Sequence, residues 1–90
     1  MREGTLDHSE VRYSFQNVAG SGNTKILLHR ATEHYAADDN GEWIKSDYHT
    51  GRPEGLKPYE ILQLEAALRD HVENRRAEFA ARRAPREPDS

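Results

Sequence analysis

The longest stretch of this chain without an internal glycine or proline runs from Pro58 to Ala84. Apolar residues recur along it at spacings near 3.6, the period of an amphipathic helix: Ile61, Leu64, Leu68, Val72 and Phe79. Pro58 suits a first helical position, and Pro85 ends the stretch. At 1.5 Å per residue such a helix extends about 40 Å, which is more than a short three-stranded sheet can cover. We therefore predict a helix over residues 58–84 whose first half packs on a sheet and whose second half, poor in strong apolar residues, projects from it.

Residues 10–18 have the clearest strand pattern, because Val11, Tyr13 and Phe15 alternate with polar residues. A period of two is typical of a strand with one face in the core and the other in water. The following residues, 19–23, are rich in glycine, serine and asparagine and predict a turn. This turn lacks the order of residues that a phosphate-binding loop requires.

Residues 25–37 allow two interpretations, of which the first is a helix. Leu27 and Tyr35 then fall on one apolar stripe. Against the helix, Asp38 and Asp39 would lie at the negative end of its dipole.

The second interpretation is a strand that enters a β-hairpin at Asn40-Gly41, the strongest short signal for such a turn. A two-residue turn there pairs Ala37 with Ile44 and His34 with Asp47. This register separates most apolar from most polar side chains, and it places Trp43 on the polar face. We favour the hairpin and keep the helix as the alternative.

These elements predict an α+β fold, a three-stranded antiparallel β-meander with one long C-terminal amphipathic helix packed on one face (β-β-β-α). We expect residues 1–84 to form a single small domain and residues 85–90 to be a disordered tail. The expected core comprises the apolar residues that share a face in this arrangement: Val11, Tyr13, Phe15, Leu27, Tyr35, Ile44, Tyr48, Ile61, Leu64, Leu68 and Val72.

Length and composition exclude several classes of protein. A chain of 90 residues is too short for a two-domain enzyme, and 34% hydrophobic residues allow only a thin core. The absence of cysteine excludes disulfides, zinc–thiolate clusters and a thiol nucleophile. No apolar run is long enough to cross a bilayer, so we expect no membrane association and a cytoplasmic location.

The residue types for metal binding or catalysis are present without a supporting pattern. The predicted hairpin brings His34, Asp47 and His49 to one exposed face, but their spacing matches no familiar metal motif. Ser46 falls on the opposite face from His34 and Asp47, so no nucleophile lies beside a base. We therefore expect no enzymatic activity, no catalytic residue, no metal site and no cofactor.

Two surface patches combine basic residues with an aromatic residue, the composition of an interface centre. The first patch lies on the polar face of the predicted hairpin and comprises Arg30, Trp43, Lys45 and His49. The second patch lies on the last turns of the predicted helix and comprises Arg75, Arg76, Phe79, Arg82 and Arg83.

Each patch has an alternative explanation. Trp43 can cover Leu28 as a minor second core. The helix arginines can belong to a solvated face of ion pairs such as Glu65–Arg69 and Glu78–Arg82.

The leading functional hypothesis is a small non-enzymatic regulator or inhibitor that occupies the surface of a partner protein. Small size, lack of cysteine and a net charge of −3 are similar to those of inhibitors encoded by phages and mobile elements, such as anti-CRISPR proteins. The alternative is a nucleic-acid-binding accessory protein that uses the C-terminal arginine stripe. A homodimer built on the half-exposed helix is compatible with either function.

Overall fold

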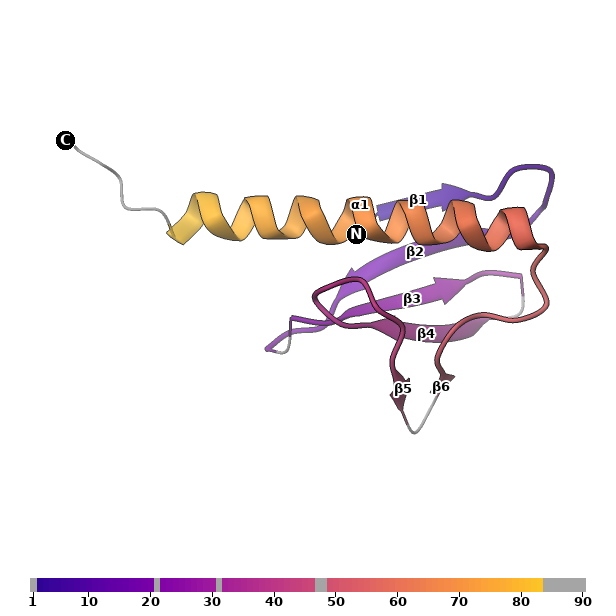
Figure 1. Cartoon of the computed structure of the whole chain (residues 1–90), viewed down its shortest axis with the longest axis horizontal. Helices are drawn as coiled ribbons and strands as arrows, with labels where there is room; N and C mark the ends of the chain where they lie inside the picture. Colours follow the sequence, from indigo (N-terminus) through magenta and orange to yellow (C-terminus); the bar gives the residue numbers. More distant parts are fainter. Residues whose placement is uncertain (1, 21, 31, 47–48, 84–90) are drawn as a thin grey trace.

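The computed structural model describes residues 2–20, 22–30, 32–46 and 49–83 of the chain (Figure 1). Its main element is a four-stranded antiparallel sheet in the order β1-β2-β3-β4. The strands of this sheet are β1 (Arg2–Thr5), β2 (Arg12–Asn17), β3 (Thr24–Leu28) and β4 (Glu33–Ala37). A two-stranded ribbon of β5 (Lys45–Ser46) and β6 (His49–Thr50) follows, and then the helix α1 (Pro58–Arg83). The α+β class and the C-terminal helix are confirmed, whereas the sheet has four strands and not three.

The segment 25–37 is neither a helix nor one strand. The chain turns back within it, so that β3 and β4 pair with Ile26 opposite Tyr35 and Leu28 opposite Glu33. Thr32, in this turn, has the left-handed φ of 55°. Because the turn changes the phase of the alternation, β3 directs Ile26 and Leu28 into the core. The prediction that Leu27 belongs to the core is therefore wrong, and Leu27 lies on the opposite face of the sheet, half-buried.

The turn after β4 is one residue longer than predicted. The Gly41 N–H donates to the Asp38 carbonyl at 3.0 Å, and the Asp38 N–H donates to the Glu42 carbonyl at 2.9 Å. Gly41, with φ of 85°, supplies the left-handed residue that closes such a three-residue loop. Ala37 consequently pairs with Trp43.

A register shift of one residue exchanges the two faces of a strand. Trp43 therefore packs against the core, and Ile44 is half-buried outside it, which corrects the predicted positions of both residues. The third predicted strand is reduced to this single bridge and the short β5–β6 ribbon. Tyr48 and Asp47, which the prediction placed on it, lie outside the described residues, as does the predicted tail 85–90.

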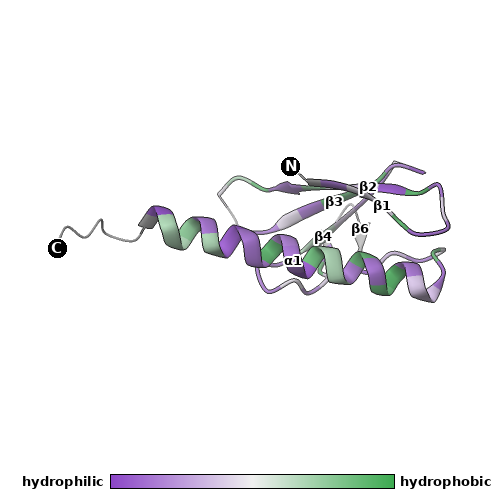
Figure 2. Cartoon of the chain, turned by 90° about the horizontal axis from the view of Figure 1, so that it is seen from above, coloured by the Kyte–Doolittle hydropathy of each residue, from purple (hydrophilic) through white to green (hydrophobic). Residues whose placement is uncertain are grey.

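The core lies between one face of the sheet and the first half of α1 (Figure 2). Phe15, Ile26 and Leu64 are fully buried at its centre. The buried cluster contains five further residues of the predicted core: Val11, Tyr13, Tyr35, Leu68 and Val72. It also contains, besides Ile26, four residues that were not predicted: Leu6, Leu28, Ala37 and Leu56. Ile61, which was predicted, is partly buried against the cluster. The side chains of residues 76–82 are all exposed. Figures 1 and 2 both show the C-terminal part of α1 extending past the strands, as predicted.

The start of α1 is stabilised by a cap from the Glu60 side chain. The Lys57 N–H donates to Glu60 Oε1 at 3.0 Å, and the Ile61 N–H donates to the Lys57 carbonyl at 3.0 Å. The hydrogen bond from Lys57 lowers the pKa of the Glu60 carboxyl below its ordinary value. The predicted helix start at Pro58 is confirmed. Within the described part of the chain, this helix lacks the apolar length that a membrane span requires.

Candidate functional site

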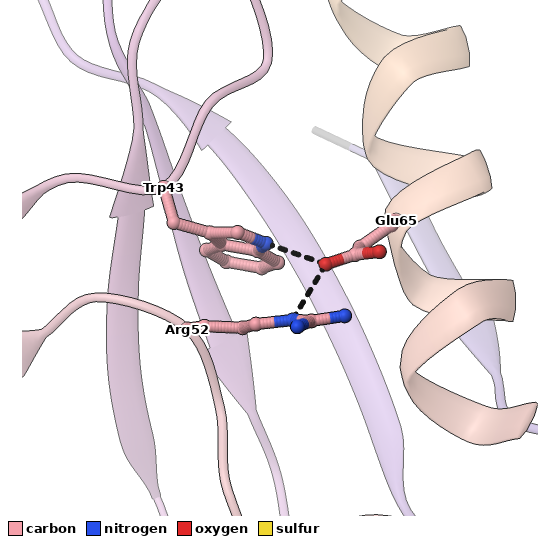
Figure 3. A network of polar contacts seen from close by, with 3 residues as sticks. All are labelled: Trp43, Arg52 and Glu65. Atoms are coloured by element: carbon pink, nitrogen blue, oxygen red, sulfur yellow. Dashed lines mark hydrogen bonds and ion pairs between the residues drawn. The ribbon is translucent and has the colours of Figure 1, made fainter. Parts of the chain in front are cut away.

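The side chain of Trp43, the aromatic residue of the first patch, packs against the core. Its ring lies 6.4 Å from the ring of Tyr35 in a T-shaped contact, and it is half-buried against the core. Its indole N–H donates to Glu65 Oε2 at 3.0 Å, and Arg52 Nε lies 2.7 Å from the same oxygen (Figure 3). This network ties the loop after β4 and the loop before α1 to the helix, so Trp43 is not the exposed aromatic residue that the sequence predicted.

The other members of the first patch lie on three different elements, the β3–β4 turn, β5 and β6. Arg30 is exposed in the β3–β4 turn, and its Nη2 lies 3.6 Å from the position that a Cβ on Gly55 would take. Lys45 is exposed on β5 and lies beside Gly51. His49 belongs to β6, and its side chain lies outside the described part of the structure. Without Trp43 at its centre, the first patch is one basic residue in a turn and two on the short β5–β6 ribbon.

The contribution of Tyr35, which packs against Trp43, to the stability of the fold is expected to depend on pH. Burial and a hydrogen bond from its Oη to Glu33 Oε1 at 2.8 Å raise its pKa from 10.0 to about 12. The folded state holds the phenolic proton more tightly than the unfolded chain does. The stabilising contribution is therefore complete below pH 10.0 and is lost as the pH rises through about 12. Tyrosinate absorbance should show an ionisation near pH 12 that the Tyr35→Phe variant lacks; identical titration curves would contradict the assignment.

The face of the sheet opposite α1 carries one nucleophile beside a base. Ser14 Oγ lies 3.3 Å from His29 Nε2, a pair that sequence spacing could not reveal because Ser14 lies on β2 and His29 directly follows β3. Ser14 is 2% exposed, so a substrate carbonyl has no access to its hydroxyl. His34 lies on the same face. Among the described residues, no group of three or more histidine, aspartate or glutamate side chains could hold a metal ion.

The second patch divides into a buried and an exposed part. Arg75 is 8% exposed, and its Nη1 donates to the Gly22 carbonyl at 3.1 Å and to Thr24 Oγ1 at 2.8 Å. Arg76 is exposed, and its Nη2 donates to the Asp39 carbonyl and to Asn40 Oδ1, each at 2.5 Å. These two arginines therefore hold the β2–β3 turn and the turn after β4 against α1.

Phe79 and Arg82 form the exposed part of the second patch. Phe79 is 46% exposed, and the Arg82 guanidinium lies over its ring at 5.8 Å from the centroid. Such a contact orients the cation and keeps the aromatic face accessible from one side. The Arg83 side chain lies beyond the described side chains.

The predicted helix-surface ion pairs are replaced by other contacts. Glu65 pairs with Arg52, as described above, in place of Arg69. Arg82 lies over Phe79, and the described residues place no carboxylate in an ion pair with it. The charge of Arg82 is therefore available at the surface.

A hollow of about 300 Å³ opens beside Phe79. The second half of α1 contributes Val72, Arg75, Arg76, Phe79 and Ala80 to its lining, and the two turns contribute Gly22 and Asp39. The hollow thus joins three residues of the second patch to two turns that are distant in the sequence. Its size is at the lower end of the range of small-molecule sites, about 300–1,000 Å³.

Comparisons with protein-family models, with curated proteins and with solved structures give no match for this chain.

Proposed function

We propose that this protein is a small non-enzymatic regulator or inhibitor that binds a partner protein through the second half of α1. The observation that carries the proposal is the exposure of Phe79, 46%, on a helical segment that extends past the sheet. Among the described residues, Phe79 is not a member of the buried core cluster. Aromatic residues, phenylalanine included, and arginine are enriched in the cores of protein interfaces.

The shape of the molecule supports the same surface. The side chains of residues 76–82 are exposed along a rigid helix, so a partner can contact them without any unfolding of the domain. The hollow beside Phe79 adds a concave element, which most flat helix surfaces lack. Arg30, Lys45 and His49 remain candidate contacts of a separate surface, since Arg30 lies beside Gly55, before the start of α1.

Affinity capture tests the proposal. The wild-type chain and the double variant Phe79→Ala with Arg82→Glu serve as baits, with Leu62→Ala plus Arg69→Glu as the matched control on the first half of α1. Leu62 is 65% exposed and Arg69 is exposed, so the control likewise removes one large exposed apolar side chain and reverses the charge of one exposed arginine on the same helix. A protein retained by the wild type and the control and lost from the double variant supports the proposal. Equal capture by all three baits would refute it.

The second candidate function is nucleic-acid binding. It is favoured by the uncompensated charges of Arg76 and Arg82, whose described contacts are to neutral groups. Binding through phosphate contacts weakens steeply between about 50 and 200 mM salt because counterions are released. Retention of a nucleic acid at low salt, with loss over this range and in the Arg82→Glu variant, would favour this function over protein binding.

A further inference from the structure

The lining of the hollow divides by chemistry into an apolar wall and a charged rim. Val72, Phe79 and Ala80 form the apolar wall on one side of α1. Val72 is 3% exposed and belongs to the core cluster, so this wall continues the core outward to the surface. Burying an aromatic or branched aliphatic side chain against such a wall removes apolar surface from water on both partners.

The charges around the hollow are unbalanced. Arg75 and Arg76 line it, against the single carboxylate of Asp39. The described hydrogen bonds of Arg75 and Arg76 go to carbonyl, hydroxyl and amide oxygens, all of which are neutral. Buried cations are normally paired with an anion, because desolvation of an unpaired charge is costly.

Arg75 also has an unused donor. Its Nε is buried, and among the described residues no acceptor reaches it. A buried donor without an acceptor is uncommon and calls for an explanation, such as an ordered water, an ion or a ligand. The Arg75 side chain lines the hollow, so a group bound there would lie next to Arg75.

The geometry points to a specific occupant: the hollow is an anchor site for an apolar side chain in an acidic segment of the partner protein. The apolar wall receives the side chain, and the carboxylates of the segment meet Arg75, Arg76 and Arg82. This inference rests on the proposed function and names the chemistry of the partner. Charge complementarity of this kind gives an interface its orientation and its rate of association.

Titration with short peptides, followed through the amide and arginine Nε–H resonances, tests the anchor site on the intact protein. The probe is a blocked pentapeptide with a central phenylalanine flanked by two aspartates on each side. We expect saturable shifts at Gly22, Val72 and Ala80 and at the Arg75 Nε–H, with a Kd of about 1 mM or below. The control peptides carry alanine in the centre or lysines in place of the aspartates, and both should bind at least about tenfold more weakly.

Three outcomes would overturn the inference. The first is the absence of saturable shifts around the hollow. The second is equal binding of the alanine-centred or the lysine-flanked peptide. The third is a stronger shift of the same resonances by a single-stranded oligonucleotide, which would assign the site to nucleic acid.

A substitution that fills the hollow separates this inference from the proposed function. Ala80→Phe places a ring in the hollow and leaves Phe79 and Arg82 in place, whereas Ala81→Phe adds the same ring to an exposed position outside the lining. We expect Ala80→Phe to weaken peptide binding and partner capture at least about tenfold and Ala81→Phe to leave both unchanged. If capture survives Ala80→Phe but not Phe79→Ala with Arg82→Glu, the surface binds a protein and the anchor site is wrong.

Discussion

Replacing Phe15 with alanine is expected to destabilise the domain by about 3–5 kcal/mol, the usual cost of removing a buried aromatic side chain. Phe15 is 0% exposed, and its ring packs 5.2 Å from the ring of Tyr13 and 5.0 Å from that of His71. Phe15 also lies inside the sheet, where its backbone pairs with Arg2 on β1 and with Ile26 on β3. Since small domains are stable by only about 5–15 kcal/mol, the variant should be close to unfolding at room temperature.

Phe79→Ala is the matched control, because it removes the same side chain from an exposed position of α1. We expect it to change the free energy of unfolding by less than about 1 kcal/mol, as surface substitutions do. Urea unfolding followed by circular dichroism measures both variants. Similar losses of stability in the two variants would show that Phe79 is part of the folded core and would contradict its position at the surface.

The second large effect is on binding. The double variant Phe79→Ala with Arg82→Glu should weaken the affinity for the captured partner by about 30-fold or more, the effect of losing an energetic centre of an interface. Its stability should stay near that of the wild type, since both side chains are exposed. Titration calorimetry with the purified partner measures the affinity.

The control for this effect is the double variant Leu62→Ala with Arg69→Glu on the first half of α1. It should bind within about threefold of the wild type, because scattered exposed residues outside an interface contribute little. A loss of affinity as large as that of the Phe79 and Arg82 variant would show that the interface lies on the outer side of the first half of the helix.

The helix could be predicted from the sequence because its signals are local. All of these signals lie within one segment: the cap at Glu60, the recurrence of Leu64, Leu68 and Val72, and the C-terminal end that is poor in apolar residues. The strand 12–17 was predictable for the same reason, since alternation of side chains suffices to recognise it. The projection of the last turns of α1 followed from comparing the length of the helix with that of the sheet.

The sheet was less predictable because its turns carry weak or ambiguous signals. The β3–β4 turn contains no glycine, proline or asparagine, and Thr32 takes its left-handed conformation without the residue types that usually mark one. At Asn40-Gly41 the turn was recognised, but its length was not. Because a single added residue reverses the faces of a strand, that error alone moved Trp43 from the predicted surface to the core.

Three residues of the second patch line the hollow, but neither its shape nor its other lining residues could be predicted from the sequence. The pattern of arginine around Phe79 is visible in the sequence. The burial of Arg75 is not, because its partners Gly22 and Thr24 lie in a turn more than 50 positions away. The hollow depends on the same long-range contacts, so only the folded structure shows that the second patch borders a hollow.

The central claim is that α1 divides into a first half that stabilises the domain and a second half that binds the partner. Amide hydrogen exchange of α1, measured with and without the captured partner, tests this division most directly. We expect slow exchange over Leu64–Val72 in the free protein. On binding, we expect new protection only at residues 76–82 and in the two turns that line the hollow. New protection over the outer side of the first half of α1 or over the open sheet face, with residues 76–82 unchanged, would contradict it.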